Sequence, residues 1–157
     1  MTSIVTVESP IVKLGSQGQA VKDLQILLNQ TVAAKLSVDG IFGAKTEDAV
    51  KTTQSIFFLE IDGIVGAKTW IVLRTNEPIE MPVLKRGSKG DLVRRVQAVL
   101  KVASLYTGNL DGEFGALTEA AVKTFQKDRK GSVKQLGVID QQTWKDLVGT
   151  ARFFALD

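Results

Sequence analysis

The chain repeats itself at an offset of 72 residues, and this duplication limits the possible folds more than any other feature of the sequence. Residues 38–50, VDGIFGAKTEDAV, return at 110–122 as LDGEFGALTEAAV. Aligning 10–55 with 82–127 gives 20 identities in 46 pairs, and a further shift of two residues places Trp70 on Trp144. We therefore predict two copies of one unit of about 70 residues.

The boundaries of the copies follow from this alignment and from proline. The linker lies within NEPIEMPVL, where Pro78 and Pro82 would end a helix and stiffen the chain. We predict an N-terminal segment at 1–9, a first repeat at 10–76, a linker at 77–82 and a second repeat at 83–157.

Apolar residues recur at helical spacing in three stretches of each copy. In the first copy the stretches carry Val21, Leu24 and Leu28, then Ala49, Val50 and Phe57, then Trp70 and Leu73. We predict an all-α chain of two tandem three-helix bundles, in which both tryptophans lie in the core and ARFFALD at 151–157 continues the last helix into an apolar contact. The weak alternation of TSIVTV at 2–7 is compatible with a short N-terminal strand.

An Asp-Gly turn occurs three times, at 39–40, at 111–112 and within DGIVGAKT at 62–69. Asp can bond nearby backbone amides, Gly accepts positive φ, and the Gly three residues on can begin a helix. Because the first copy contains the turn twice, we interpret it as structural, with Phe42 and Phe114 filling the core from the turn. Four glutamines at matched helix positions are predicted to bond a loop backbone rather than a ligand: Gln25, Gln54, Gln97 and Gln126.

The chain has no Cys and no His. This composition excludes zinc held by those residues, a Cys nucleophile and a Ser–His–Asp triad. Asp111 and Glu113 form the one carboxylate pair worth considering for glycoside cleavage, but they are neighbours on a turn that the fold itself needs. We predict a protein that is not an enzyme and that uses no metal and no cofactor.

Charge is distributed unevenly along the chain. Residues 1–78 carry 7 basic and 8 acidic groups, and residues 79–157 carry 13 and 9. A basic surface favours an anionic partner such as a wall polymer or nucleic acid, although a mixed solvated surface explains the same counts. The run KRGSKGDLVRR at 85–95 lacks aromatic residues that could stack on bases, so we expect no nucleic-acid partner. No apolar stretch reaches the roughly 20 residues of a membrane span, and the first residues show no signal peptide.

Three ordered motifs give the chain a resemblance to a known family. They are GSxGxxVxx[LV]Q, DGxFGxxTxxAVxx[FT]Q and G[IV][VI]xxxTWxxL, found from Gly15 to Leu73 and again from Gly87 to Leu147. This pattern resembles the peptidoglycan-binding domain family that is often appended to bacterial cell-wall hydrolases. The resemblance implies a three-helix bundle per copy and a non-catalytic module that binds the glycan strand or stem peptide of peptidoglycan, accessory to a hydrolase, in the cell wall or periplasm.

The second copy matches the family pattern better than the first. It has Tyr106, Gly108 and Phe125 where the first copy has Ala34, Leu36 and Thr53, which leaves open whether the first repeat binds at all. A glycan site needs an exposed aromatic ring beside polar groups. We predict such a site at Tyr106, Asn109, Asp111, Gly112, Phe114 and Thr118, so that Tyr106→Ala would weaken binding and spare folding. The alternative for Tyr106 is a half-buried residue at a helix end.

A second interpretation keeps the fold and changes the partner. The same bundle could serve as an interaction or scaffold module that grips another protein, a cell-wall hydrolase included. The diverged first copy and the missing signal segment favour this alternative, under which a cytoplasmic location stays open.

Overall fold

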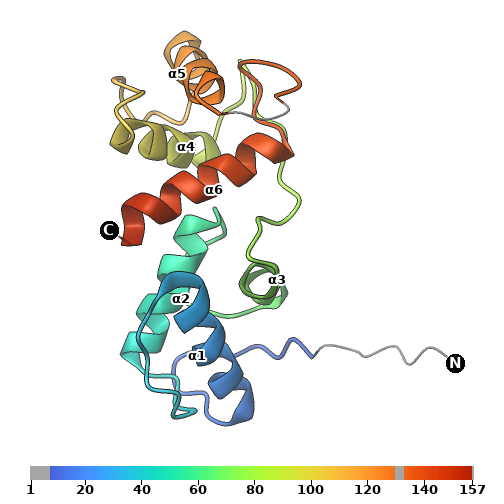
Figure 1. Cartoon of the computed structure of the whole chain (residues 1–157), viewed down its shortest axis with the longest axis vertical. Helices are drawn as coiled ribbons and strands as arrows, with labels where there is room; N and C mark the ends of the chain where they lie inside the picture. Colours follow the sequence, from blue (N-terminus) through green and yellow to red (C-terminus); the bar gives the residue numbers. More distant parts are fainter. Residues whose placement is uncertain (1–7, 130–132, 157) are drawn as a thin grey trace, which may run out of the picture. The chain divides into compact units, whose positions relative to one another are not determined.

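The computed structural model describes residues 8–129 and 133–156, and most of these residues are helical (Figure 1). The helices are α1 (Gln19–Val32), α2 (Ala44–Ile56), α3 (Ala67–Thr75), α4 (Asp91–Val102), α5 (Ala116–Lys127) and α6 (Gln141–Leu156). Within the described residues, β pairing is limited to isolated bridges. The prediction of an all-α chain with two tandem three-helix repeats is confirmed, and the strand expected at 2–7 lies outside the described residues.

The described chain divides into two compact units. The first contains the described residues up to Ser55 together with Leu59–Asn76, and the second contains Ile56–Phe58 together with the described residues from Glu77 onward. Inside the second unit the ring of Phe58 packs edge-on against Trp144, with centroids 5.1 Å apart. The boundaries drawn at residues 9, 76 and 82 stay predictions.

Each unit is closed around one tryptophan, as expected from the sequence. Trp70 is 1% exposed and Trp144 is fully buried. The indole Nε1 of Trp70 donates to the carbonyl of Pro10 at 2.8 Å, and that of Trp144 donates to the carbonyl of Pro82 at 2.9 Å. Because a buried indole needs a hydrogen-bond acceptor, each tryptophan fixes the segment that opens its own repeat.

Backbone bridges complete this closure. In the first unit the segment before α1 pairs at Val12 with Val65, and in the second unit the segment before α4 pairs at Leu84 with Ile139. Both bridges join the opening segment of a repeat to the turn that precedes its third helix. The turns are therefore built into the core of each unit.

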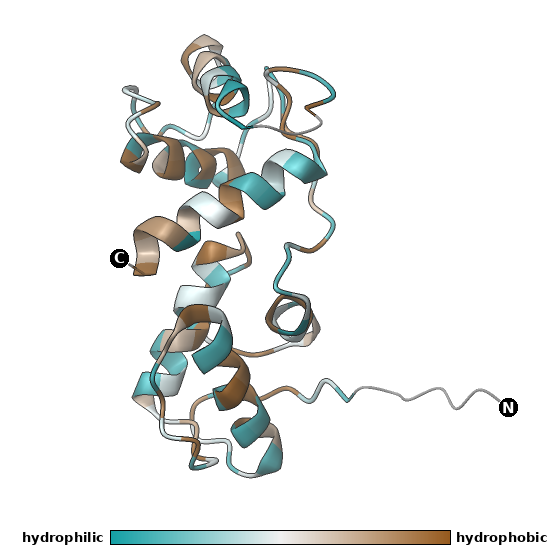
Figure 2. Cartoon of the chain, in the orientation of Figure 1, coloured by the Kyte–Doolittle hydropathy of each residue, from teal (hydrophilic) through white to brown (hydrophobic). Residues whose placement is uncertain are grey.

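Helix α6 continues to Leu156, as predicted, but its end is not buried. Figure 2 shows the helix becoming more hydrophobic toward its C-terminal end. Its buried residues stop at Thr150, while Phe153 is 61% exposed and Phe154 is 42% exposed. These two rings meet edge to face, with centroids 5.2 Å apart.

Candidate functional site

A buried glutamine from the preceding helix holds the first Asp-Gly turn. Gln25 on α1 accepts a hydrogen bond from the backbone N–H of Gly40 at 3.0 Å. Its Nε2 donates to Asp39 Oδ1 at 3.0 Å, to the Ile41 carbonyl at 3.1 Å and to Thr46 Oγ1 at 3.3 Å, so two hydrogens are shared among three acceptors. We call this group, consisting of a glutamine, its turn and the threonine of the following helix, a glutamine clamp.

The glutamine clamp occurs four times in the described part of the chain. The other three join Gln54 to Gly63 and Thr69, Gln97 to Gly112 and Thr118, and Gln126 to Gly137 and Thr143. The turn glycines have φ between +71° and +84°, the region that favours glycine. The predicted structural role of the turn, and of the four glutamines, is confirmed.

The turn of the fourth clamp was not predicted from the sequence, because it lacks the Asp-Gly pair. Its segment, LGVIDQQT at 136–143, has Leu136 where the other three turns have Asp, and Asp140 where they have Gly. Asp140 Oδ1 accepts from the backbone N–H and the hydroxyl of Thr143, which caps the start of α6. The common elements are a helix glutamine, a turn glycine and a threonine six residues after that glycine.

The structure contradicts the prediction that Tyr106 presents an exposed stacking face. The side chain is only 5% exposed, its hydroxyl donates to the carbonyl of Asn109 at 2.6 Å, and it accepts from Gln97 Nε2 at 3.3 Å. The ring can fold back in this way because the residue two positions on is glycine. A Cβ on Gly108 would lie 2.6 Å from the tyrosine hydroxyl.

The other residues of the predicted site are divided between core and surface. Gly112, Phe114 and Thr118 are buried, so they shape the turn and have little surface to offer a ligand. Asn109 and Asp111 are exposed on the same loop. A ligand-binding role for these six residues stays a prediction, and only Asn109 and Asp111 have the exposure that it requires.

Two of the turn aspartates are held in the ionised form. The side-chain amide of Gln25 and the backbone N–H of Ile41 donate to Asp39 and lower its pKa below the usual 3.8. For Asp111 the backbone N–H of Glu113 has the larger effect, followed by Gln97, and the pKa is again lowered. Both carboxylates are therefore negatively charged at neutral pH.

A pocket of about 350 Å³ lies beside the first turn, in the first unit. We call it the first-repeat pocket. Its lining includes the clamp residues Gln25 and Thr46, the charged side chains of Lys35, Asp39 and Lys45, and the apolar side chains of Leu36 and Ile41. The sequence did not predict this pocket, because the site was expected in the second copy, which matches the family pattern better. The available signal was Lys35 and Lys45, which stand where the second copy has Thr107 and Leu117.

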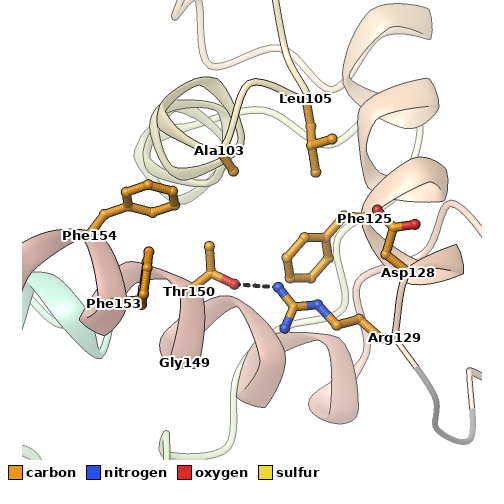
Figure 3. A pocket seen from close by; sticks show the side chains of 9 residues that line it. All are labelled: Ala103, Leu105, Phe125, Asp128, Arg129, Gly149, Thr150, Phe153 and Phe154. Carbon is orange, nitrogen blue, oxygen red and sulfur yellow. Dashed lines mark hydrogen bonds between the residues drawn. The ribbon is translucent and has the colours of Figure 1, made fainter.

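A second pocket, of about 580 Å³, lies within the second unit (Figure 3). Leu105, Phe125, Phe153 and Phe154 give it apolar walls. Arg129 lies over the ring of Phe125 at 4.5 Å and donates to Thr150 Oγ1 at 2.7 Å. This pocket is more apolar than the first-repeat pocket, and two of its three aromatic side chains, Phe153 and Phe154, come from the exposed end of α6.

Fold and clamps together define a tandem of small helical modules whose loops are fixed by buried glutamines. The family model described as "Putative peptidoglycan binding domain" matches the chain twice, over residues 17–73 and 89–147. The chain belongs to this family of peptidoglycan-binding domains, which are binding modules.

Similar solved structures include three proteins. The N-terminal domain of SleB is 33% identical, with 44% of this chain and 94% of that one covered and a TM-score of 0.42. An endolysin of the Burkholderia phage AP3 is 29% identical, with coverages of 64% and 34% and a TM-score of 0.43. A fused Zn-dependent amidase/peptidase/peptidoglycan-binding domain-containing protein from Clostridium acetobutylicum is 29% identical, with coverages of 61% and 42% and a TM-score of 0.40. Among the described residues of this chain, no helix has the length and apolar character of a membrane span.

Proposed function

We propose that this chain is a non-catalytic module that binds bacterial cell-wall peptidoglycan and thereby holds an associated wall hydrolase on its substrate. The observation that carries the proposal is the double match to the peptidoglycan-binding domain family, which covers both repeats. The exposed carboxylates of Asp39 and Asp111 support it because each uses Oδ1 within its own turn and still has a second oxygen, Oδ2, that can accept a hydrogen bond from a ligand. The proposal places the protein at the cell wall.

Co-sedimentation with purified insoluble murein tests the binding proposal. The chain has a sequence pI of about 9.2, so the murein should first be freed of anionic wall polymers, and an unrelated protein of similar pI should serve as the control. We expect the chain in the pellet and the control in the supernatant. A chain that stays in the supernatant at low and high salt alike contradicts the proposal.

A second candidate function is attachment to another protein. It is favoured by the end of α6, where Phe153 and Phe154 expose a pair of aromatic rings beside an apolar pocket (Figure 3). The double variant Phe153→Ser/Phe154→Ser distinguishes the two functions. If the aromatic pair serves a protein partner, co-purification of that partner is lost while sedimentation with murein is unchanged.

A further inference from the structure

The corresponding turns of the two repeats differ in charge. In the first repeat the positions around the turn carry Lys35, Ile41 and Lys45, whereas the second repeat has Thr107, Glu113 and Leu117 at the same places. Glu113 forms an ion pair with Lys89 at 3.6 Å. At positions 35 and 45 the first repeat therefore has cationic side chains, whereas the second repeat has uncharged side chains at the corresponding positions 107 and 117.

The charges of the first-repeat pocket are available to a ligand. Among the described residues, the ammonium groups of Lys35 and Lys45 form no ion pair with any carboxylate. The Oδ1 atom of Asp39 accepts from Gln25 and from the N–H of Ile41, while its Oδ2 has no hydrogen-bond partner within the described part of the chain. Two cations and one anion thus surround about 350 Å³ of open space.

The lining indicates a ligand with charges of both signs. An uncharged glycan would leave the ammonium groups and the carboxylate without opposite charges, whereas a ligand with carboxylates and an ammonium group can pair with all three. The side chains of Leu36 and Ile41 add apolar surface for short aliphatic groups. In murein these features belong to the stem peptide, which carries free carboxylates, a diamino acid and alanine methyl groups, and they are absent from the uncharged backbone of the glycan strand.

We infer that the first-repeat pocket is a binding site for the stem peptide of murein, in which Lys35 and Lys45 pair with carboxylates and Asp39 pairs with the ammonium group of the diamino acid. This inference rests on the proposed function and refines it in two respects. It assigns binding to the first repeat, although the second repeat matches the family pattern better, and it assigns recognition to the peptide rather than to the sugar.

Isothermal titration calorimetry of the full chain with the tripeptide L-Ala-γ-D-Glu-meso-diaminopimelate tests the inference. The double variant Lys35→Thr/Lys45→Leu introduces the residues of the second repeat. We expect it to bind the tripeptide roughly ten- to a hundredfold more weakly, as for the loss of charge-assisted hydrogen bonds. The single variant Lys45→Leu should weaken binding, whereas Lys68→Leu should not. Lys68 is the matched control because it occupies the same position of GAKT at the start of α3 and is also exposed.

Sedimentation with two substrates separates this inference from the proposed function. Intact murein tests whether the chain binds the wall. Glycan strands freed of stem peptides by amidase treatment test what is recognised, provided that the strands are immobilised on beads and that the lactyl carboxylates exposed by the cleavage are capped as amides. Retention on intact murein alone, lost in Lys35→Thr/Lys45→Leu, supports the inference. Equal retention on both substrates with no tripeptide binding overturns the inference and leaves the proposed function standing. Retention on neither overturns the proposed function. Thermal melts should show that Lys45→Leu and Lys68→Leu are as stable as the parent, since both lysines are exposed. Lys35→Thr places a β-branched residue at φ +55° and should lower the melting temperature, so Lys45→Leu alone provides the comparison of binding at equal stability.

Discussion

Gln25 shows how much one side chain can contribute at the scale of a single residue. It is 1% exposed, and its amide accepts from Gly40 and donates to a carboxylate, a carbonyl and a hydroxyl. Replacing it with an apolar residue of similar size leaves several buried polar groups without partners. Each such group costs about 1–3 kcal/mol, which is more than the net gain of a typical hydrogen bond.

We expect Gln25→Leu to lower the free energy of unfolding by about 2 to 4 kcal/mol, because the N–H of Gly40 and the hydroxyl of Thr46 lose their partner together. Urea unfolding followed by circular dichroism measures the loss. The control is Gln30→Leu on the same helix, where the side chain is exposed. If both variants unfold at the same urea concentration, the clamp contributes little to stability.

The turn aspartates predict a dependence of stability on pH. Since the folded pKa values of Asp39 and Asp111 lie below the usual 3.8, the ionised carboxylates stabilise the folded state above that pH, and this contribution is lost as the pH falls through the folded pKa. Asn at these positions keeps an oxygen acceptor but never carries the charge.

We therefore expect Asp39→Asn/Asp111→Asn to melt below the parent at neutral pH, with a difference that stays constant down to about pH 5 and shrinks below about pH 4. Thermal melts across this range measure the difference. A gap that remains the same at about pH 2 would show that the effect comes from hydrogen-bond geometry rather than from charge.

At the scale of a loop between two helices, the repeats use mutually exclusive residue pairs. The second repeat combines Tyr106 with Gly108, and a side chain at 108 would collide with the tyrosine hydroxyl. The first repeat combines Ala34 with Leu36, and there Asn29 fixes the loop by bonding both the N–H and the carbonyl of Leu36. Placing a tyrosine at position 34 alone would create the same collision with Leu36, so the tyrosine of the second repeat requires its glycine as well.

A double-mutant cycle in the second repeat tests this pairing. Tyr106→Ala removes a buried ring and should cost about 3 kcal/mol of stability, contrary to our expectation from sequence that folding would be spared. Gly108→Leu alone should cost about 1–3 kcal/mol through overpacking. Because the double variant recreates the pair found in the first repeat, its loss should fall short of the sum by about 1–2 kcal/mol. Strict additivity in urea unfolding would show that the two positions do not compete for space.

The sequence predicted well the features that are determined by residues close together in the chain, namely the helices and the Asp-Gly turns. Helical spacing identified three helices in each repeat, and the matched glutamines indicated a loop contact. The burial of Tyr106 depends on a missing side chain two residues away and on an acceptor at Asn109, and neither produces a periodic signal. The first-repeat pocket depends on how a loop and the first turn of α2 meet, which only the folded chain displays.

At the scale of the whole molecule, duplication has conserved the scaffold and changed the surface. Both repeats contain two glutamine clamps and one core tryptophan. The net charge differs, because residues 79–157 carry 13 basic and 9 acidic groups and residues 1–78 carry 7 and 8. Buried polar networks tolerate little change because a partner lost in the core is costly, whereas exposed charges can be exchanged at little cost to stability. The exposed residues that differ between the repeats are therefore better indicators of a binding surface than the buried residues that the repeats share.

Finally, we expect the purified chain to release no soluble fragments from labelled murein, with boiled protein as the baseline and a lytic enzyme as the positive control. Cleavage of a glycoside requires a carboxylic acid that is still protonated near neutral pH, but hydrogen bonds from the backbone N–H of Glu113 and from Gln97 lower the pKa of Asp111. Without His and Cys, the chain also lacks the residues that most often supply a general base or a thiol nucleophile. Release above the boiled control that disappears in Glu113→Gln would contradict this expectation and would make the second turn an active site.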